Sequence, residues 1–274
     1  MSTQGRGGGG TKDEDAKYMF DRIGKDVYDK VKEEAKTYDS YLKGNLADSS
    51  IFGVELASSN NPFTFEYNKL LGARGKRHPC GTGDAKKEER FSNTLGGQCT
   101  NSKMRSDGIG ACAPYRRLHL CHHNLESIDT DKIDSTKAKH KLLAEVCMAA
   151  KYEGESLVDK HKKYKETHKD TNICTVLARS FADIGDIIRG KDLYRGNNRE
   201  NDKLESKLKV IFGKIHSEVT NGKNGKNLQA LRDRYIDDAK GGDFFKLRED
   251  WWYANRNDVW KAITCNAPKE DHYF

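Results

Sequence analysis

Long apolar runs are missing from this 274-residue sequence, and no stretch approaches the roughly 18 apolar residues that a transmembrane helix needs. We therefore expect no membrane-spanning helix within it. The glycine-rich first ten residues lack the apolar segment of a signal peptide, and no Asn-x-Ser/Thr sequon occurs. Proline is scarce as well: four prolines beside three tryptophans argue against a disordered or fibrous chain.

Charge is abundant and unevenly distributed. Charged residues make up 33% of the chain and hydrophobic residues only 35%, which predicts a thin core and a highly charged surface. Residues 1–75 hold 11 basic and 12 acidic residues, so the net charge of +7 arises after residue 75. Such a surface attracts polyanions, whether nucleic acid, anionic lipid or sulfated glycan.

Seven cysteines, an odd number, leave at least one without a partner in the chain. Disulfides without a signal peptide require an unusual export route, and the alternative is a reduced cytosolic protein with structural or metal-binding thiols. Cys112 and Cys121 are nine residues apart, a loop short enough to close, and we predict a disulfide between them. The seven cysteines are Cys80, Cys99, Cys112, Cys121, Cys147, Cys174 and Cys265.

Helical periodicity dominates both ends of the chain. Apolar residues recur every three or four positions from Ala16 to Leu42, after a capping-box spacing at 11–14 and before Gly44. Residues 45–135 are rich in glycine and cysteine and weakly periodic, which indicates loops. From residue 136 onward, apolar spacing predicts helices near 136–168, 173–189, 204–219, 228–236 and 244–263. Gly190 would end the second of them. No strand alternation is convincing, so the fold class is all-α, with 173–188 as the buried core helix.

Four motifs connect the sequence to a known family. They are Cys-Ala-Pro-Tyr-Arg-Arg-Leu-His-Leu-Cys at 112–121, Ala-Arg-Ser-Phe-Ala-Asp-Ile-Gly-Asp-Ile-Ile-Arg-Gly at 178–190, Leu-Arg-Glu-Asp-Trp-Trp at 247–252 and Val-Trp-Lys-Ala-Ile-Thr-Cys at 259–265. In this order they closely resemble the Duffy-binding-like alpha domain of the variant erythrocyte membrane proteins of Plasmodium falciparum. Residues 1–75 resemble the N-terminal segment of the same proteins.

The resemblance implies an organisation and a location. It implies an N-terminal segment over 1–75 whose long helix packs on the domain, a loop-rich cysteine-containing subdomain over 76–135 and a helical subdomain over 136–274, linked by disulfides. It supports a pair between Cys174 and Cys265. A third, cysteine-bearing subdomain is expected beyond this sequence, along with the parts that attach the protein to a membrane. The whole would be exported without a cleaved signal and exposed on the infected erythrocyte.

Basic clusters are the sharpest functional signal. His-Lys-Lys-Tyr-Lys-Glu at 161–166 has the order of basic residues often associated with heparin binding, and Lys162, Lys165 and Lys169 would share one helix face. Flexible lysine stems could meet successive sulfates, although a solvated face is the simpler interpretation. The full candidate set is Lys160, Lys162, Lys163, Lys165, Lys169, Arg74, Lys76, Arg77, Arg116 and Arg117. The two last-named arginines could instead bond internally to carbonyls or a carboxylate.

These clusters predict an adhesin that binds a sulfated glycosaminoglycan such as heparan sulfate and supports adhesion or rosetting of infected erythrocytes. A blood-group sugar or complement receptor one on red cells is a further receptor that the resemblance implies. A basic helical protein that binds nucleic acid is the competing interpretation, but the clusters lack exposed interleaved aromatics. A third interpretation is structural support for other adhesive domains.

Catalysis and metal binding are poorly supported. Asp183 and Asp186 share a helix face, but an ion pair within an apolar helix explains them better than acid–base catalysis. Cys112, Cys121 and the adjacent histidines 122 and 123 lack the paired spacing of zinc sites. We expect no enzyme activity, cofactor or metal, and we expect the closing tryptophans to be core residues.

Overall fold

The computed structural model describes residues 16–49, 59–81, 90–91, 114–192, 198–222 and 227–268. The regular structure of these residues is helical throughout, and none of them forms a strand, which confirms the all-α fold class. None of the helices in these ranges is both long enough and apolar enough to cross a membrane.

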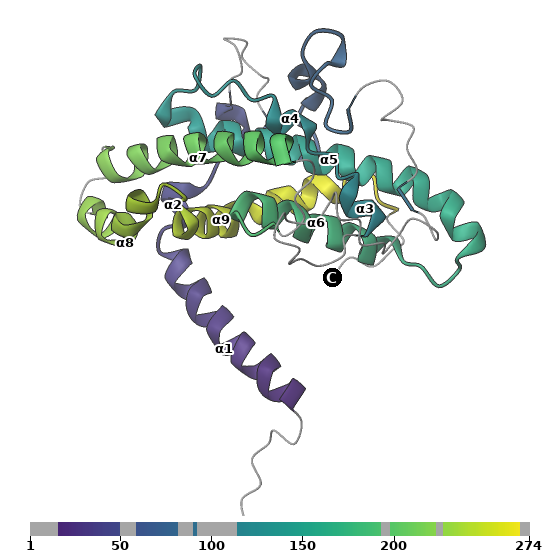
Figure 1. Cartoon of the computed structure of the whole chain (residues 1–274), viewed down its shortest axis with the longest axis horizontal. Helices are drawn as coiled ribbons and strands as arrows, with labels where there is room; N and C mark the ends of the chain where they lie inside the picture. Colours follow the sequence, from purple (N-terminus) through teal and green to yellow (C-terminus); the bar gives the residue numbers. More distant parts are fainter. Residues whose placement is uncertain are drawn as a thin grey trace, which may run out of the picture.

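The helices follow the predicted order along the chain. In Figure 1 the longer ones form one elongated body, with α7, α5, α6 and α9 side by side and α1 projecting from it. The α-helices are α1 (Ala16–Lys36), α2 (Asp39–Leu42), α3 (Tyr115–Leu118), α4 (His123–Glu126), α5 (Ser135–Thr167), α6 (Ile173–Arg189), α7 (Asn198–Asn221), α8 (Leu228–Gly241) and α9 (Phe245–Thr264), and the short 3-10 helices are η1 (Leu46–Asp48), η2 (Tyr67–Leu71) and η3 (Ala73–Gly75).

The central element is α5. It has 33 residues, so it is about 50 Å long, and the Asp134 side chain caps it by accepting a hydrogen bond from Thr136 N. It packs against α9, α7, α6 and α4, and its residues from Leu142 to Ala150 are all buried. The prediction that α6 is a buried core helix is confirmed, but α5 contributes more buried residues than α6. Helix α5 is central because it packs against several helices at once, and its buried glutamates are paired with arginines.

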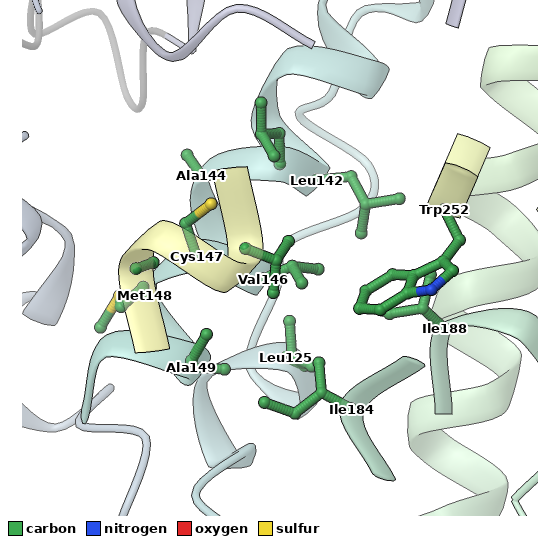
Figure 2. Packing of buried hydrophobic residues seen from close by; sticks show 14 of the residues in the cluster. Leu125, Leu142, Ala144, Val146, Cys147, Met148, Ala149, Ile184, Ile188 and Trp252 are labelled. Carbon is green, nitrogen blue, oxygen red and sulfur yellow. The ribbon is translucent and has the colours of Figure 1, made fainter. Parts of the chain in front are cut away.

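A close crossing joins α5 to α9. A Cβ atom on Gly154 would lie 1.9 Å from the carbonyl oxygen of Ile263, so only glycine fits at this contact. From the same helix α9, Trp251 and Trp252 enter the core, and Figure 2 labels Trp252 together with Ile184 and Ile188 of α6 among the buried residues. These tryptophans are thus core residues, as the sequence predicted.

Arg248 caps the end of α6 from inside the protein. Its guanidinium is fully buried and donates from Nε to Ile188 O at 2.6 Å and from Nη2 to Ile187 O at 3.1 Å. Glu205 of α7 accepts from the same guanidinium at 2.7 Å. Gly190 ends the helix in the left-handed conformation at φ 73°, as its position after the apolar run predicted. The guanidinium of Arg248 thereby connects α9 to both α6 and α7.

The N-terminal helix is interrupted before the body. The sequence predicted one helix as far as Leu42, but α1 ends at Lys36 and the short α2 follows it. Helix α1 meets α9, where Arg256 Nη2 donates to the hydroxyl of Tyr28 at 2.8 Å. Beyond that contact α1 extends away from the body (Figure 1), and Ile23 and Val27 remain 44% and 57% exposed.

Both predicted disulfides were wrong. Cys121 pairs with Cys80, 41 residues earlier, and not with Cys112, which lies outside the described residues. His123 N donates to Pro79 O at 2.9 Å, and this contact brings the two bonded segments together. Cys265 carries a free thiol, so the Cys174–Cys265 pair is not formed. Spacing along the chain showed which loops can close, but it could not show which segments meet.

The surroundings of Cys121 and Cys147 determine the chemistry of their sulfur atoms. Cys121 is held in a disulfide and therefore cannot supply the thiolate that a zinc site with the neighbouring histidines would need. Cys147 is fully buried on α5, and burial raises the pKa of its thiol well above the ordinary value. A buried thiol of this kind behaves as a small apolar side chain.

Candidate functional site

Partly buried aromatic residues pack at the C-terminal end of α5. The rings of Tyr164 and His168 stack in parallel with centroids 4.0 Å apart, and Phe91 stacks on Tyr164 at 4.8 Å. His161, which is buried, shares a hydrogen bond of 3.1 Å between its Nε2 and Thr171 Oγ1. This aromatic stack fixes which face of the last helical turns points outward. Sequence reasoning missed it because Phe91 comes from a distant, loop-rich segment.

The lysines predicted to bind glycan lie on the outward side of the same turns. Lys162, Lys163 and Lys165 are all exposed on α5. With 3.6 residues per turn, Lys162 and Lys165 are about 60° apart around the axis, whereas Lys163 is about 100° from Lys162. Lys160 lies on the side of Lys163, half-buried, with its ammonium 3.9 Å from Asp159. The structure therefore divides the cluster into two adjacent faces.

Lys169 does not continue the helical row. Helix α5 ends at Thr167, His168 is its C-cap, and Lys169 lies exposed in the turn before α6. The predicted single row of Lys162, Lys165 and Lys169 on one helix was therefore wrong at its last member. The backbone of His168 is no longer helical, with φ −128° and ψ 74°, so Lys169 is not placed on the helix surface.

Three of these lysines face no acidic partner. No carboxylate of the described residues lies within ion-pair distance of Lys162, Lys165 or Lys169. We name these three residues, two on α5 and one in the turn that follows it, the α5 lysine cluster. An ammonium group that is not paired with a carboxylate of the protein can pair with an anionic ligand instead. The cluster is therefore suited to bind an anion.

Arg116 and Arg117 turned out to be structural. Both are buried: Arg116 Nη2 lies 2.7 Å from Asp183 Oδ2 of α6, and Arg117 Nη2 lies 2.5 Å from Asp192 Oδ2. Arg116 also donates to Ser180 Oγ at 2.6 Å. Their proposed role in glycan binding is corrected by this burial, because the α3 turn points both guanidinium groups inward. The alternative of internal carboxylate partners is the one observed.

The same contacts account for the two aspartates on α6. Asp183 is held by Arg116, and Asp186 accepts a hydrogen bond from Arg189 Nη2 at 2.6 Å. Burial raises the pKa of Asp183 and of Asp186, and the facing arginines oppose that rise. Each carboxylate therefore has an arginine partner that explains it structurally.

The third basic group, at 74–77, is divided between interior and surface. Arg77 Nη2 lies 2.6 Å from Glu145 Oε1 and its Nη1 donates to Leu70 O at 3.0 Å, so Arg77 is a structural residue. Its predicted glycan contact is thereby corrected. Lys76 is exposed at the end of η3, which also contains Arg74. Lys76 remains available at the surface.

A further buried ion pair went unpredicted. Arg90 Nη2 lies 2.7 Å from both carboxylate oxygens of Glu153, which also accepts from Cys121 N at 3.0 Å and from Ser180 Oγ at 2.6 Å. Burial alone would raise the pKa of Glu153, but Arg90 and these donors hold that pKa below its ordinary value. The one signal in the sequence is an acidic residue on the buried face of α5.

The comparisons with known proteins assign the family. The Duffy binding domain model matches residues 110–274, and the model of the N-terminal segments of PfEMP1 matches residues 15–50. The chain belongs to the Duffy binding domain family. The expected resemblance is thereby confirmed. In this family, a PfEMP1 N-terminal segment and its domain are exported to the surface of the infected erythrocyte as part of a larger membrane protein.

Solved structures of this family match most of the chain. The NTS-DBL1-alpha and CIDR-gamma double domain of PfEMP1 from the Plasmodium falciparum varO strain is 35% identical, with a TM-score of 0.67, over 90% of this chain and 35% of that one. The varO NTS-DBL1(alpha-1) domain is 34% identical, with a TM-score of 0.59, over 86% and 47%. The PfEMP1 IT4var13 DBLbeta domain bound to ICAM-1 is 27% identical, with a TM-score of 0.70, over 92% and 59%.

The chain thus spans about a third to three fifths of the length of these relatives. No curated protein sequence matches it. The boundaries predicted at 75/76 and 135/136 remain a prediction, because one buried apolar cluster includes residues from all three predicted units.

Proposed function

We propose that this Duffy binding domain is an adhesion module that binds sulfated glycan, such as heparan sulfate, through the α5 lysine cluster. The observation that carries the proposal is the exposure of Lys162, Lys165 and Lys169 without a facing carboxylate. In this proposal, four further residues contribute positive charge that attracts the same ligand: Lys160, Lys163, Lys76 and Arg74. The site would support adhesion or rosetting of infected erythrocytes.

The mechanism is electrostatic docking on a prepared surface. The stack of Phe91, Tyr164 and His168 holds the end of α5, so the lysine stems extend from a fixed base. Each ammonium that meets a sulfate releases a condensed counter-ion, so binding weakens as salt concentration rises. Long lysine stems also let the ammonium groups follow a chain whose sulfates are irregularly spaced.

The test is elution from immobilised heparin in a salt gradient. The variant changes Lys162, Lys165 and Lys169 to Ala; the matched control changes Lys137, Lys203 and Lys246, three other exposed lysines, to Ala. We expect the cluster variant to elute at clearly lower salt than the control, and its logarithmic salt slope to fall by about 2 to 3. Equal elution of the two variants would show that net charge alone retains the protein and would remove the cluster from the proposal.

A protein receptor is the second candidate. The relative solved in complex with ICAM-1 is similar over 92% of this chain, which supports a surface able to bind a host glycoprotein. Binding of red cells that persists after enzymatic removal of heparan sulfate, and in the cluster variant, would favour such a receptor over the glycan. Duplex DNA run as a competitor on the heparin column separates glycan preference from general polyanion binding.

A further inference from the structure

The two sulfur atoms of the Cys80–Cys121 disulfide lie in different surroundings. Arg90 Nη1 donates to Cys121 Sγ at 3.3 Å, whereas Cys80 Sγ lies 3.6 Å from the carbonyl oxygen of Tyr152. A positively charged N–H donor stabilises a thiolate, and a carbonyl oxygen disfavours one because its lone pairs face the negative sulfur. When the bond between the two sulfurs breaks, its electron pair is therefore favoured on Cys121.

Arg90 uses a separate nitrogen for the sulfur. Its Nη2 donates to both carboxylate oxygens of Glu153 at 2.7 Å, while its Nη1 donates to Cys121 Sγ and, at 3.0 Å, to Ser156 Oγ. The Glu153 carboxylate offsets part of the guanidinium charge, so the effect on Cys121 comes mainly from the N–H group directed at its sulfur. The Arg90 and Glu153 side chains are less than 5% exposed, and such a contact is stronger in the interior than in water.

The two cysteines also differ in exposure and in how firmly they are held. Cys121 is 1% exposed, and its backbone N donates to Glu153 Oε2 at 3.0 Å. Cys80 is partly exposed and belongs to a turn in which Gly81 N donates to His78 O at 2.9 Å. A reagent from solution therefore reaches Cys80 more readily than Cys121.

We propose that the Cys80–Cys121 disulfide is a thiol-exchange site, at which a small external thiol forms a mixed disulfide with Cys80. The thiolate of the reagent attacks Cys80 Sγ, and a bond forms between these two sulfur atoms. The Cys80–Cys121 bond breaks, and its electron pair stays on Cys121 Sγ as a thiolate beside Arg90. One disulfide replaces another, so no electron is gained or lost overall. Arg90 favours this direction because a more stable thiolate departs faster.

The experiment treats the whole folded chain with reduced glutathione in native buffer. Accessible free thiols, such as Cys265, are first blocked with iodoacetamide, and the reaction is stopped with acid and N-ethylmaleimide. Peptide mass spectrometry then shows which cysteine carries glutathione and which carries N-ethylmaleimide. We expect glutathione on Cys80 in about tenfold excess or more over Cys121, and N-ethylmaleimide on Cys121. The rate should not change in urea well below the unfolding midpoint.

An Arg90→Met/Glu153→Gln variant separates the effect on the leaving group from an effect on stability. It removes both charges of the buried pair, and exchange should slow by about threefold or more. A merely structural role of the pair predicts faster exchange, since a less stable fold opens more often and exposes the disulfide. The control Arg234→Met/Asp250→Asn removes a buried pair between α8 and α9 and should not slow exchange.

Three outcomes overturn the proposal: glutathione on Cys121 as often as on Cys80, exchange in Arg90→Met/Glu153→Gln as fast as in the wild type or faster, and exchange that requires denaturant. The first and third are measured on the wild type, so the proposal stays testable even if the double variant does not fold. The reaction involves no glycan and none of the α5 lysine cluster. Failure of the heparin test and failure of this one are therefore distinguishable.

Discussion

Arg90 and Glu153 form a buried pair in which Nη2 of the arginine lies 2.7 Å from each carboxylate oxygen. Both side chains are less than 5% exposed, and Arg90 Nη1 also lies 3.3 Å from the sulfur of Cys121. One ion pair therefore attaches the segment at 90–91 to both the central helix and the disulfide. Its burial makes it a sensitive point of the fold, because neither charge can regain water without opening the structure.

Replacing Arg90 with Ala leaves Glu153 buried and unpaired. We expect a loss of about 3 to 5 kcal/mol in the free energy of unfolding, measured by urea denaturation. Lys240→Ala is the control, because Lys240 pairs with Asp237 on the surface, and such pairs contribute about 0 to 1 kcal/mol. If the two variants lose equal stability, the buried pair does not have the role assigned to it.

Acid should weaken the fold through Glu153. Its pKa in the folded state lies below the ordinary 4.5, so its stabilising contribution is complete above about pH 4.5 and is lost as pH falls through the lower folded value. Asp183 and Asp186 have raised pKa values and act with the opposite sign, since the folded state binds their protons more readily. Urea midpoints between pH 7 and pH 3 should therefore fall less steeply in Glu153→Gln than in the wild type. Parallel curves would contradict the assignment to Glu153.

Gly154→Ala should disrupt the crossing of α5 and α9. The added methyl would approach the backbone oxygen of Ile263 to 1.9 Å, and backbone cannot move aside as a flexible side chain can. We expect a loss of about 1 to 3 kcal/mol, or more if the helices separate, measured as a lower Tm. Gly24→Ala on α1 meets no atom within 4 Å and is the matched control, expected to leave Tm unchanged or to raise it, since alanine favours a helix more than glycine does.

The Cys80–Cys121 bridge should be found by mass spectrometry of peptides from unreduced protein. Because it closes a loop of 41 residues, replacing both cysteines with Ser should cost about 4 kcal/mol in the chain-entropy estimate. Cys265→Ser removes a thiol that is not bridged and should change Tm little. A peptide that links Cys112 to Cys121 would contradict the observed pairing.

Local sequence patterns located most of the helices correctly. The apolar spacing predicted α5, α6, α7, α8 and α9, and Gly190 was recognised as a helix end, because these features depend on residues within a turn or two of each other. The break between α1 and α2 was not predicted, since the apolar stripe continues across it. The long motifs also identified the family, which the comparison with family models confirmed.

The basic clusters show where local patterns stop being informative. In the sequence, Arg77, Arg116 and Lys162 each belong to a short cluster of basic residues. The fold buries the two arginines against Glu145 and Asp183, which are 68 and 67 positions away, and leaves the lysine in solvent. The same holds for cysteine, because Cys121 meets a partner 41 residues earlier in place of one nine residues away.

By itself, the sequence determined the helical class, the order of the helices, the family and the position of the exposed lysines on α5, all of which follow from neighbouring residues and recognisable motifs. Only the tertiary structure decided which cations are internal and which cysteines pair. Those outcomes depend on how helices distant in the chain pack, and packing places a charge beside its partner or in water irrespective of sequence spacing.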